Sequence, residues 1–256
     1  MLELWHLSGG YRGEDKVKEI SARFREGEVT AVVGPNGCGK STLLKLIVRL
    51  LKPTSGKILL EGVDAASLTR REFARKVSFL PQARAVPHMS AGALVLHGRY
   101  PYLSYSRRYS KKDFEAVEDA LAATGTEKFR DIPLESLSGG ERQKVYLAML
   151  IAQDTDVVLL DEPTTYLDIS RQFELMSLIG TLRQRRKTVV AVLHDLGLAL
   201  RYADRILVLE HGKLRACGSP DDIYHSGTID CVFQIHTRRI SSPAGVEYVF
   251  SPERSS

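Results

Sequence analysis

A glycine-rich segment between a strand and a helix is the feature that most constrains this chain. The segment is Gly34-Pro35-Asn36-Gly37-Cys38-Gly39-Lys40-Ser41-Thr42, and it follows an apolar run, Val29–Val33, that predicts a buried strand. Apolar residues then recur with helical spacing from Lys40 to Leu51, and Pro53 closes the helix. The segment fits the pattern G-x-x-x-x-G-K-[ST] in the strand–loop–helix context that the pattern requires. We therefore expect an α/β fold whose loop binds phosphate.

The chemistry of such a loop assigns roles to several of its residues. Glycines let the loop wrap closely, so that backbone N–H groups and the positive end of the new helix point at phosphate oxygens. We expect Lys40 to contact the β- and γ-phosphates and the Ser41 hydroxyl to bind Mg²⁺. Cys38 occupies a free position, where we expect a small filler. The loop alone indicates only a nucleotide, because kinases, GTPases and motor ATPases all carry one.

The order of the other signals predicts the architecture. Strand patterns at Leu2–Leu7 and Val17–Phe24 precede the loop, and short strands and helices alternate after residue 156. This alternation favours a mainly parallel sheet with right-handed crossovers and with ligands at the carboxyl ends of its strands. Between about 83 and 153 only helical patterns stand out, which predicts an inserted helical lobe. Its helices are expected at Ser90–Arg99, Ser110–Thr124 and Gly139–Gln153.

Composition excludes several classes of protein. Among 256 residues, 43% are hydrophobic and 26% are charged, as in a soluble globular protein rather than a disordered one. Three scattered cysteines favour a reducing compartment over a disulfide framework. The sequence offers neither a signal peptide nor an apolar stretch long enough to span a bilayer, so we expect a soluble cytoplasmic protein. The net charge of +5 permits an anionic partner without choosing one.

Two carboxylates follow a second apolar strand. Val157–Leu160 precedes Asp161-Glu162-Pro163. We expect this strand to lie beside the strand that enters the glycine loop, so that Asp161 binds Mg²⁺ directly or through water. Glu162 could then polarise the water that attacks the γ-phosphate, as a general base. Capping of the next turn is the alternative role for such a pair.

A second anion-binding surface is predicted where another helix begins. Ser138, Gly139 and Gly140 lie there, within the sequence Leu137-Ser138-Gly139-Gly140-Glu141-Arg142-Gln143. Because one phosphate loop is already present, the economical use of a second surface is to contact the γ-phosphate held by another copy. This predicts a head-to-tail dimer with two ATP molecules between its subunits.

With these motifs in this order, the chain resembles the nucleotide-binding subunits of ABC transporters from Leu2 to Pro220. The resemblance implies that Tyr11 stacks on adenine and that Gln82 contacts Mg²⁺ and reports to membrane subunits. It also implies that Asp168, in the sequence Tyr166-Leu167-Asp168, lies in a loop that crosses the dimer interface. His194, at the end of the strand Thr188–Leu193, would hydrogen-bond the γ-phosphate.

The resemblance predicts the fold, the domain boundaries and the residues of the site. The fold would be a P-loop ATPase core with an N-terminal antiparallel β-subdomain, spanning 1–220 with the lobe at about 83–153, followed by a short extension, 221–256. The cofactors would be ATP and Mg²⁺. One departure from the pattern is Glu141, where many family members carry Gln. The expected catalytic residues are Lys40, Gln82, Glu162 and His194, and the expected metal-binding residues are Ser41, Gln82 and Asp161.

The branch of the family is suggested by two further segments. Gly98-Arg99-Tyr100-Pro101-Tyr102 and Thr164–Ile169 resemble the ATPases of ferric-siderophore, ferric-dicitrate, haem and cobalamin importers, although a His often stands where this chain has Tyr102. The chain ends 62 residues after His194 (256 − 194), which disfavours the sugar importers with their longer regulatory domain. We therefore expect an importer of an iron(III) chelate, with haem or cobalamin as alternatives.

This expectation includes partners and a location. A second copy, transmembrane permease subunits and, indirectly, a periplasmic or lipoprotein binding protein are expected, at the cytoplasmic face of the membrane. An ABC ATPase acting on nucleic acid or ribosomes is the alternative class. Its candidate contacts are the basic clusters Arg107-Arg108, Lys111-Lys112 and Arg185-Arg186-Lys187, for which exposed helical faces are the simpler explanation. A small-molecule kinase would not need Leu137–Gly140, and no nucleic acid is expected as a partner.

Overall fold

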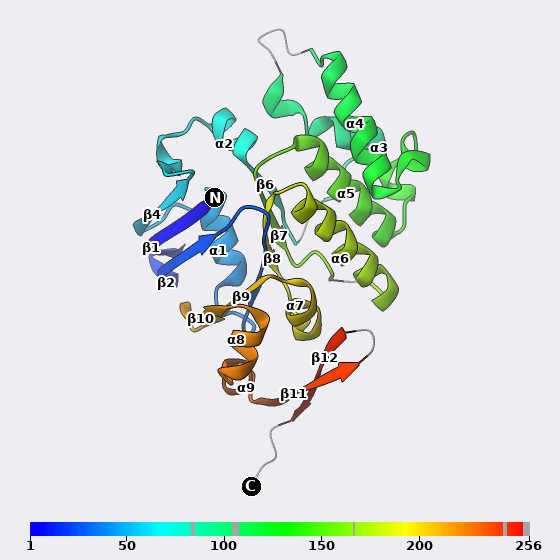
Figure 1. The fold of residues 1–256 in the computed structure, drawn as a ribbon. Coiled ribbons are helices and arrows are strands. Elements are labelled where there is room, and N and C mark those ends of the chain that lie inside the picture. Colours follow the sequence, from blue (N-terminus) through cyan, green and yellow to red (C-terminus); the bar gives the residue numbers. More distant parts are fainter. Residues whose placement is uncertain (83–84, 104–107, 166, 243–244, 253–256) are drawn as a thin grey trace.

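The computed structural model describes residues 1–82, 85–103, 108–165, 167–242 and 245–252. A six-stranded sheet forms the centre of the molecule (Figure 1). Five of its strands are parallel, and the edge strand β10 runs antiparallel to β9. In spatial order the strands are β10 (Lys213–Gly218), β9 (Arg205–Glu210), β3 (Val29–Val33), β8 (Thr188–Val192), β7 (Val157–Asp161) and β6 (Val77–Leu80).

The strand order corrects one expectation. β7 does not lie beside β3, because β8 is inserted between them and pairs with both. All three strands are fully buried and, apart from Asp161 at the end of β7, consist of apolar and Thr residues, so their patterns do not encode which strand is the neighbour of which. β8 therefore ends between β3, which leads into the glycine loop, and β7, which leads to Glu162, and His194 follows two residues after β8.

A four-stranded antiparallel sheet contains the N-terminus. Its first two strands are longer than their apolar patterns suggest, because they continue into a two-residue turn at Arg12 and Gly13, where φ is +51° and +82°. The sheet follows the order β2 (Glu14–Phe24), β1 (Leu2–Tyr11), β4 (Ser55–Leu60) and β5 (Val63–Asp64).

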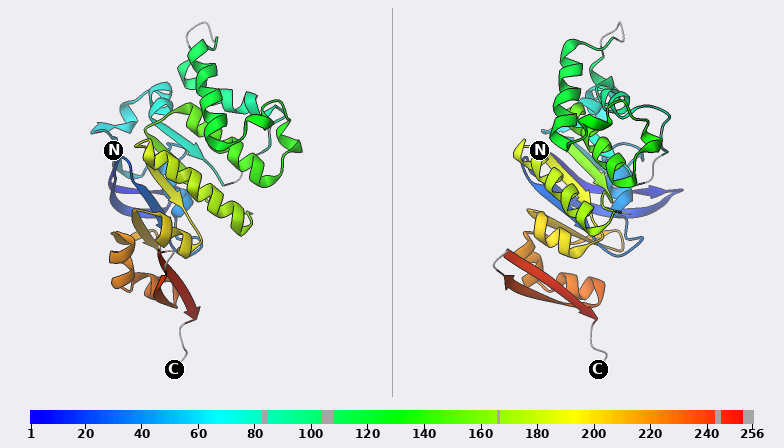
Figure 2. Two further views of the ribbon diagram at one scale, coloured as in Figure 1. Left: turned by 45° about the vertical axis from the view of Figure 1, so that its right-hand side comes forward. Right: turned by 90° about the vertical axis from the view of Figure 1, so that its right-hand side faces the viewer.

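Nine α-helices are present in the described residues, and three of them form a lobe at one side. The lobe contains α3, α4 and α5 and lies opposite the antiparallel sheet (Figures 1 and 2). Its helices begin at Ser90, Ser110 and Ser138 as N-caps, and the expected capping box of Ser110 and Asp113 is present. The α-helices are α1 (Lys40–Ile47), α2 (Arg70–Lys76), α3 (Ala91–His97), α4 (Lys111–Thr124), α5 (Gly139–Gln153), α6 (Ile169–Gln184), α7 (Leu196–Tyr202), α8 (Pro220–His225) and α9 (Thr228–Phe233).

Helix α1 ends earlier than its apolar pattern predicts. Its last helical residue is Ile47, and Arg49 takes a left-handed φ of +61°. The N–H of Leu50 then bonds the Lys45 carbonyl, and the N–H of Arg49 bonds the Leu46 carbonyl, as in a Schellman termination. Glycine or asparagine normally marks this position, so the sequence carried no signal for the stop.

The core has two parts, one on each face of the central sheet. Successive residues of β3 alternate between them, with Val32 facing α1 and the antiparallel sheet while Ala31 and Val33 face α5, α6 and α7. The second part also contains Ile223 and Ile229 of the C-terminal helices. After these helices, β11 (Ile235–Ser242) and β12 (Gly245–Pro252) form a hairpin that packs on α7 (Figure 1).

Candidate active site

The loop between β3 and α1 takes backbone conformations that glycine adopts most readily. The φ angle is +154° at Gly34, +77° at Gly37 and +108° at Gly39. A Cβ at Gly34 would lie 2.2 Å from the Leu209 carbonyl oxygen, and one at Gly39 would lie 2.6 Å from the Lys16 carbonyl oxygen. The glycines therefore let the loop pack against β9 and β2 ahead of the positive end of α1.

Lys40 opens α1, and its ammonium group lies against the preceding loop. The Nζ atom donates to the carbonyl oxygens of Gly34 at 2.7 Å and Pro35 at 3.1 Å. The residue is 5% exposed. A cation held inside the loop in this way is placed to meet a phosphate group. Cys38 is also buried, and burial raises the pKa of its thiol, which keeps it protonated.

Ser41 and Asp161 meet although β3, which leads through the glycine loop into α1, is not a neighbour of β7. The Ser41 hydroxyl donates to Oδ1 of Asp161 at 2.9 Å, so the start of α1 reaches across the end of β8. Burial raises the pKa of Asp161, and the nearby Glu162 raises it further, while the Ser41 hydrogen bond and the Lys45 and Lys40 charges lower it. A buried carboxylate of this kind gains from a nearby cation.

The same pair fits a magnesium ion. A hydroxyl and a carboxylate are the hard oxygen ligands that Mg²⁺ prefers. Within the described ranges, no group of three or more His, Cys, Asp and Glu side chains could hold a metal. An ion at Ser41 and Asp161 would therefore take further ligands from substrate oxygens, as Mg²⁺ does at nucleotide sites.

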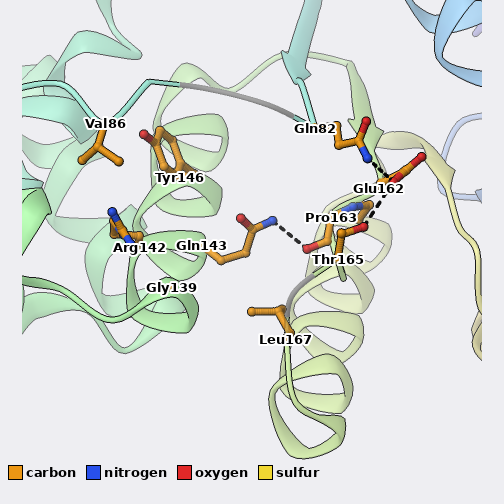
Figure 3. Close-up of a pocket in the computed structure, with 10 residues that line it drawn as sticks. All are labelled: Gln82, Val86, Gly139, Arg142, Gln143, Tyr146, Glu162, Pro163, Thr165 and Leu167. Atoms are coloured by element: carbon orange, nitrogen blue, oxygen red, sulfur yellow. Dashed lines mark hydrogen bonds between the residues drawn. The ribbon is translucent and has the colours of Figure 1, made fainter.

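Glu162 is the centre of a polar cluster at the end of β7. Gln82 Nε2 donates to Oε2 of Glu162, and the Thr165 hydroxyl contacts the same atom at 3.2 Å. His194 Nε2 lies 2.5 Å from Oε1. The cluster unites Gln82, Glu162 and His194, which the sequence could only assign one by one, and it adds Thr165, which the sequence analysis missed. Figure 3 shows the Gln82 and Thr165 contacts.

Glu162 also has an unusual backbone. Its φ is +51°, a left-handed conformation that is rare for residues other than glycine, asparagine and aspartate. Such conformations cost about 1–3 kcal/mol and persist where neighbouring contacts hold them. The side chain of this carboxylate is therefore aimed by a strained turn directly after a rigid strand.

Tyr11 stands at the end of β1, at the turn into β2. It is 42% exposed, and the Lys45 ammonium lies 5.9 Å from its ring centroid and donates to its hydroxyl at 3.3 Å. Lys45 belongs to α1, so the exposed ring lies on the side of the molecule that carries the glycine loop. An exposed aromatic face of this kind suits stacking on a planar base.

The glycines of the second anion-binding surface open α5. Ser138 is the N-cap, and its hydroxyl accepts from the Glu141 N–H at 3.3 Å while the Glu141 carboxylate accepts from the Ser138 N–H at 2.9 Å. Hydrogen bonds from Ser138 lower the pKa of Glu141. Glu141, the departure from the family pattern, thus completes a capping box. Gly139 has open space where a Cβ would be, whereas Gly140 lies under the side chain of Arg171.

A cavity of about 380 Å³ lies between α5 and the loop after β7 (Figure 3). Its lining includes Gln82, Gly139, Gln143 and Glu162. Gln143 was not singled out by sequence analysis, although a glutamine at helical spacing from the apolar residues Tyr146, Leu147 and Leu150 was the available signal.

Asp168 caps the helix that follows this loop. Its Oδ1 atom accepts from the Arg171 N–H at 2.9 Å, and Ile169, the first residue of α6, is 71% exposed. Tyr166 lies outside the described residues, and so does Arg107 of the basic clusters. Within another of those clusters, Arg186 pairs with Glu26 at 2.8 Å, as a residue of a solvated surface does.

The segment Gly98–Tyr102 links α4 and α5 within the lobe. Arg99 is paired with Asp113 at 2.9 Å, with only 12% and 7% of their side chains exposed. The same guanidinium donates to the Ala152 carbonyl at 2.8 Å and lies 3.8 Å from the Tyr102 ring centroid. Tyr102, which replaces the more frequent His, therefore has a cation–π role here.

Comparison with known proteins supplies the family. The protein-family model described as ABC transporter matches residues 17–165. The petrobactin import ATP-binding protein of Bacillus anthracis is 41% identical over 244 residues, with 94% of this chain and 89% of that protein covered. The ferric enterobactin transport ATP-binding protein of Escherichia coli K12 is 39% identical, with 93% and 88% covered. A cobalamin import ATP-binding protein of Halobacterium salinarum is 36% identical, with 100% and 65% covered.

Solved structures share the fold. A structure described as the inward-facing conformation of a metal-chelate type ABC transporter matches with a TM-score of 0.84 and 27% identity, covering 98% of this chain and 96% of that one. The dimeric cassette of a bacterial ABC transporter matches with a TM-score of 0.75 and 28% identity, covering 86% and 99%. In the described part of this chain, no helix combines the length and apolar character that crossing a bilayer requires.

Proposed function

The chain belongs to the ABC transporter family, and we propose that it is the ATP-hydrolysing subunit of an importer that takes up an iron(III) chelate of the siderophore type. The observation that carries the proposal is the similarity, over more than nine-tenths of this chain, to ATP-binding proteins of petrobactin and ferric enterobactin transport. The ABC fold, with its phosphate loop and helical lobe, is the fold of an ATPase.

We further propose how this chain holds ATP. Tyr11 stacks on the adenine ring, and backbone N–H groups of the loop Gly34–Thr42 surround the phosphates. Lys40 turns from the Gly34 and Pro35 carbonyl oxygens to the β- and γ-phosphates. Support comes from the buried ammonium group and from glycine conformations that let the loop fold closely around an anion.

The proposed site is completed by a second copy. Ser138, Gly139 and Gly140 of one copy bind the γ-phosphate held by the other, while Asp168 lies at the interface between the copies. Support comes from the helix start at Gly139, where a Cβ would meet open space, and from the exposed Ile169 beside Asp168. The related bacterial cassette is itself dimeric.

Ser41, Asp161 and Gln82 are the residues that we propose to hold Mg²⁺. The ion would supply positive charge that stabilises the phosphate oxygens as the γ-phosphoryl group transfers to water. In this structure Gln82 bonds Glu162 rather than Ser41 or Asp161, so its side chain has to turn for this role.

Glu162 is proposed to accept the proton of the attacking water. Its oxygens are engaged by Gln82 and His194 in this structure, and both contacts have to loosen before Oε1 or Oε2 can accept a proton. His194 Nε2 then donates a hydrogen bond to the γ-phosphate, while Lys40 stabilises the developing charge. Hydrolysis and phosphate release separate the two copies, and the helical lobe transmits this movement to the permease.

The proposed partners are a second copy and the transmembrane permease, with a periplasmic or lipoprotein binding protein acting indirectly. The protein would lie peripherally at the cytoplasmic face of the membrane. We propose that residues 1–220 form the ATPase domain, with the lobe at about 83–153, and that 221–256 form an extension on the core.

Uptake of cobalamin is the second candidate function, because a cobalamin import protein is among the relatives. Uptake of haem is the remaining alternative cargo.

Transport by the complete complex tests the proposal. The chain, its permease and its binding protein are reconstituted in vesicles with ATP and Mg²⁺ on the side of this subunit, and uptake of ferric siderophores, haem and cobalamin is compared. We expect ATP-dependent uptake of a ferric siderophore that is lost with Lys40→Ala. Uptake of cobalamin or haem alone would contradict the choice of cargo, and ATP-independent uptake would contradict the role of this chain.

A further inference from the structure

We propose that Gln143 is a positioning residue for Glu162, acting through the backbone of the loop that carries this carboxylate. The proposal rests on the function proposed above, because it concerns the same hydrolysis reaction. Gln143 lies in the second turn of α5 and is 7% exposed. Its Nε2 atom donates a hydrogen bond to the Pro163 carbonyl oxygen at 2.8 Å, as Figure 3 shows.

The loop needs such an anchor because of its conformation. Glu162 has a left-handed φ of +51°, which neighbouring contacts have to maintain. On one side β7 holds Asp161, and on the other the Thr165 N–H donates to the Glu162 carbonyl at 3.3 Å. Both contacts come from the strand or from the loop itself. Gln143 adds a contact from a separate helix, one residue away from the strained position.

That helix is the one that begins with the glycines proposed to meet the other copy's nucleotide. Gln143 lies one turn beyond Gly139 and Gly140. Lys144 pairs with Glu174 of α6 at 2.7 Å, and Gly140 lies under the side chain of Arg171 of α6. Helices α5 and α6 are therefore linked on both sides of the Gln143 bond, so a displacement of the glycines would be carried to Pro163.

The same face of α5 also contacts the loop after β6. The Tyr146 hydroxyl, one turn beyond Gln143, donates to the Ala85 carbonyl at 3.5 Å. Ala85 lies three residues after Gln82 in the sequence, and the amide of Gln82 bonds Glu162. Both loops that approach Glu162 are thus attached to one helix face, at Gln143 and Tyr146, across the cavity of about 380 Å³. Movement of α5 would therefore displace Pro163 and Ala85 together, and with Pro163 the backbone that carries Glu162.

The hydrogen bond is chemically specific. Methionine has a similar length to glutamine but cannot donate, so Gln143→Met leaves the Pro163 carbonyl without its donor. The loop can then relax from its strained turn, and the carboxylate loses its fixed position relative to the attacking water. We expect kcat for ATP hydrolysis to fall about tenfold, since small displacements of a catalytic group cost rate. The KM for ATP should stay within about twofold, because the bond goes to Pro163 and not to the phosphate loop.

The chain offers a matched control on the same helix. Gln153 also donates its Nε2 hydrogen to a backbone carbonyl oxygen, that of Ala74, at the same distance of 2.8 Å. Gln153→Met therefore removes the same kind of bond at the far end of α5. We expect it to lower the thermal unfolding midpoint as Gln143→Met does while leaving kcat at the wild-type value.

The experiment measures ATP hydrolysis, ATP affinity and thermal unfolding of the full 256-residue chain as wild type, Gln143→Met and Gln153→Met. A selective loss of kcat in Gln143→Met supports the proposal. Equal kcat in the two variants, or a raised KM with unchanged kcat, overturns it. If Gln143→Met does not fold, Gln143→Asn keeps a polar amide but is one methylene too short to reach Pro163, and the same outcomes apply.

A second measurement separates positioning from a direct role. In a Glu162→Gln background, where the base is absent, Gln143→Met should reduce the residual single-turnover rate less than twofold. A further tenfold loss would show that Gln143 acts independently of Glu162 and would overturn the proposal. Lack of ATP hydrolysis by the wild-type protein would instead contradict the proposed function itself.

Discussion

Replacing Gly39 with alanine should destabilise the protein more than replacing Gly37, although both lie in the same loop. Each residue has a positive φ, +108° at Gly39 and +77° at Gly37. A side chain in a left-handed conformation costs roughly 1–2 kcal/mol at either position. A Cβ at Gly37 meets nothing within 4 Å, whereas one at Gly39 would lie 2.6 Å from the Lys16 carbonyl oxygen. The loop would have to move by about 0.8 Å (3.4 − 2.6) to reach ordinary contact.

That movement sets the expected difference between the two variants. In Gly39→Ala, steric overlap in a packed site lowers the free energy of unfolding by about 1–3 kcal/mol more than in Gly37→Ala. In a protein of this size, each kcal/mol lowers the unfolding midpoint by about 2–4 °C. The shift also moves the backbone N–H groups at the start of α1, so Gly39→Ala should bind ATP more weakly than Gly37→Ala. Thermal unfolding without nucleotide and ATP titration measure the two effects. Equal midpoints for the two variants would refute the argument from the Lys16 contact.

The remaining predictions concern the lobe and the buried carboxylates. Arg99→Met should destabilise the protein by about 3–5 kcal/mol in chemical denaturation, because it leaves Asp113 buried without its cation; a loss below about 1 kcal/mol would contradict this. Burial raises the pKa of Asp113, but hydrogen bonds from Ser110 and Arg99 outweigh it and lower the pKa. Its stabilisation is therefore present above the ordinary carboxyl pKa and lost as pH falls through the lowered value, so Asp113→Asn should flatten the acid limb of a stability–pH curve. Since burial raises the pKa of Asp161, Asp161→Asn should raise the unfolding midpoint without nucleotide at neutral pH and abolish Mg²⁺-dependent hydrolysis; a lowered midpoint would count against that burial effect.

Local signals in the sequence predicted much of the fold. Helix α5 has the predicted bounds, and α4 begins at the expected capping box, because serine N-caps and apolar periodicity act within a few residues. The termination at Arg49 was missed because no glycine or asparagine stands there. The order of β3, β8 and β7 was also missed, since three similar apolar runs do not specify their neighbours.

The candidate site was predictable in its residues but not in its contacts. Pattern and resemblance named Gln82, Glu162 and His194, and the fold brings them together. The left-handed turn at Glu162 and the bond from Gln143 depend on segments that only tertiary packing brings together, so no local pattern marks them. The role of Glu141 in a capping box was available from the sequence but was not recognised.

The most direct test of the shared site is the solution state of Glu162→Gln with ATP and Mg²⁺. Light scattering and nucleotide counting should find a dimer with two ATP molecules, and turnover should fall by about 10²–10⁴ for loss of the general base. Adding Ser138→Phe, which blocks the serine–glycine helix start, should return the protein to monomers that still bind ATP. A Glu162→Gln protein that stays monomeric with ATP bound, or that hydrolyses ATP at the wild-type rate, would contradict the account.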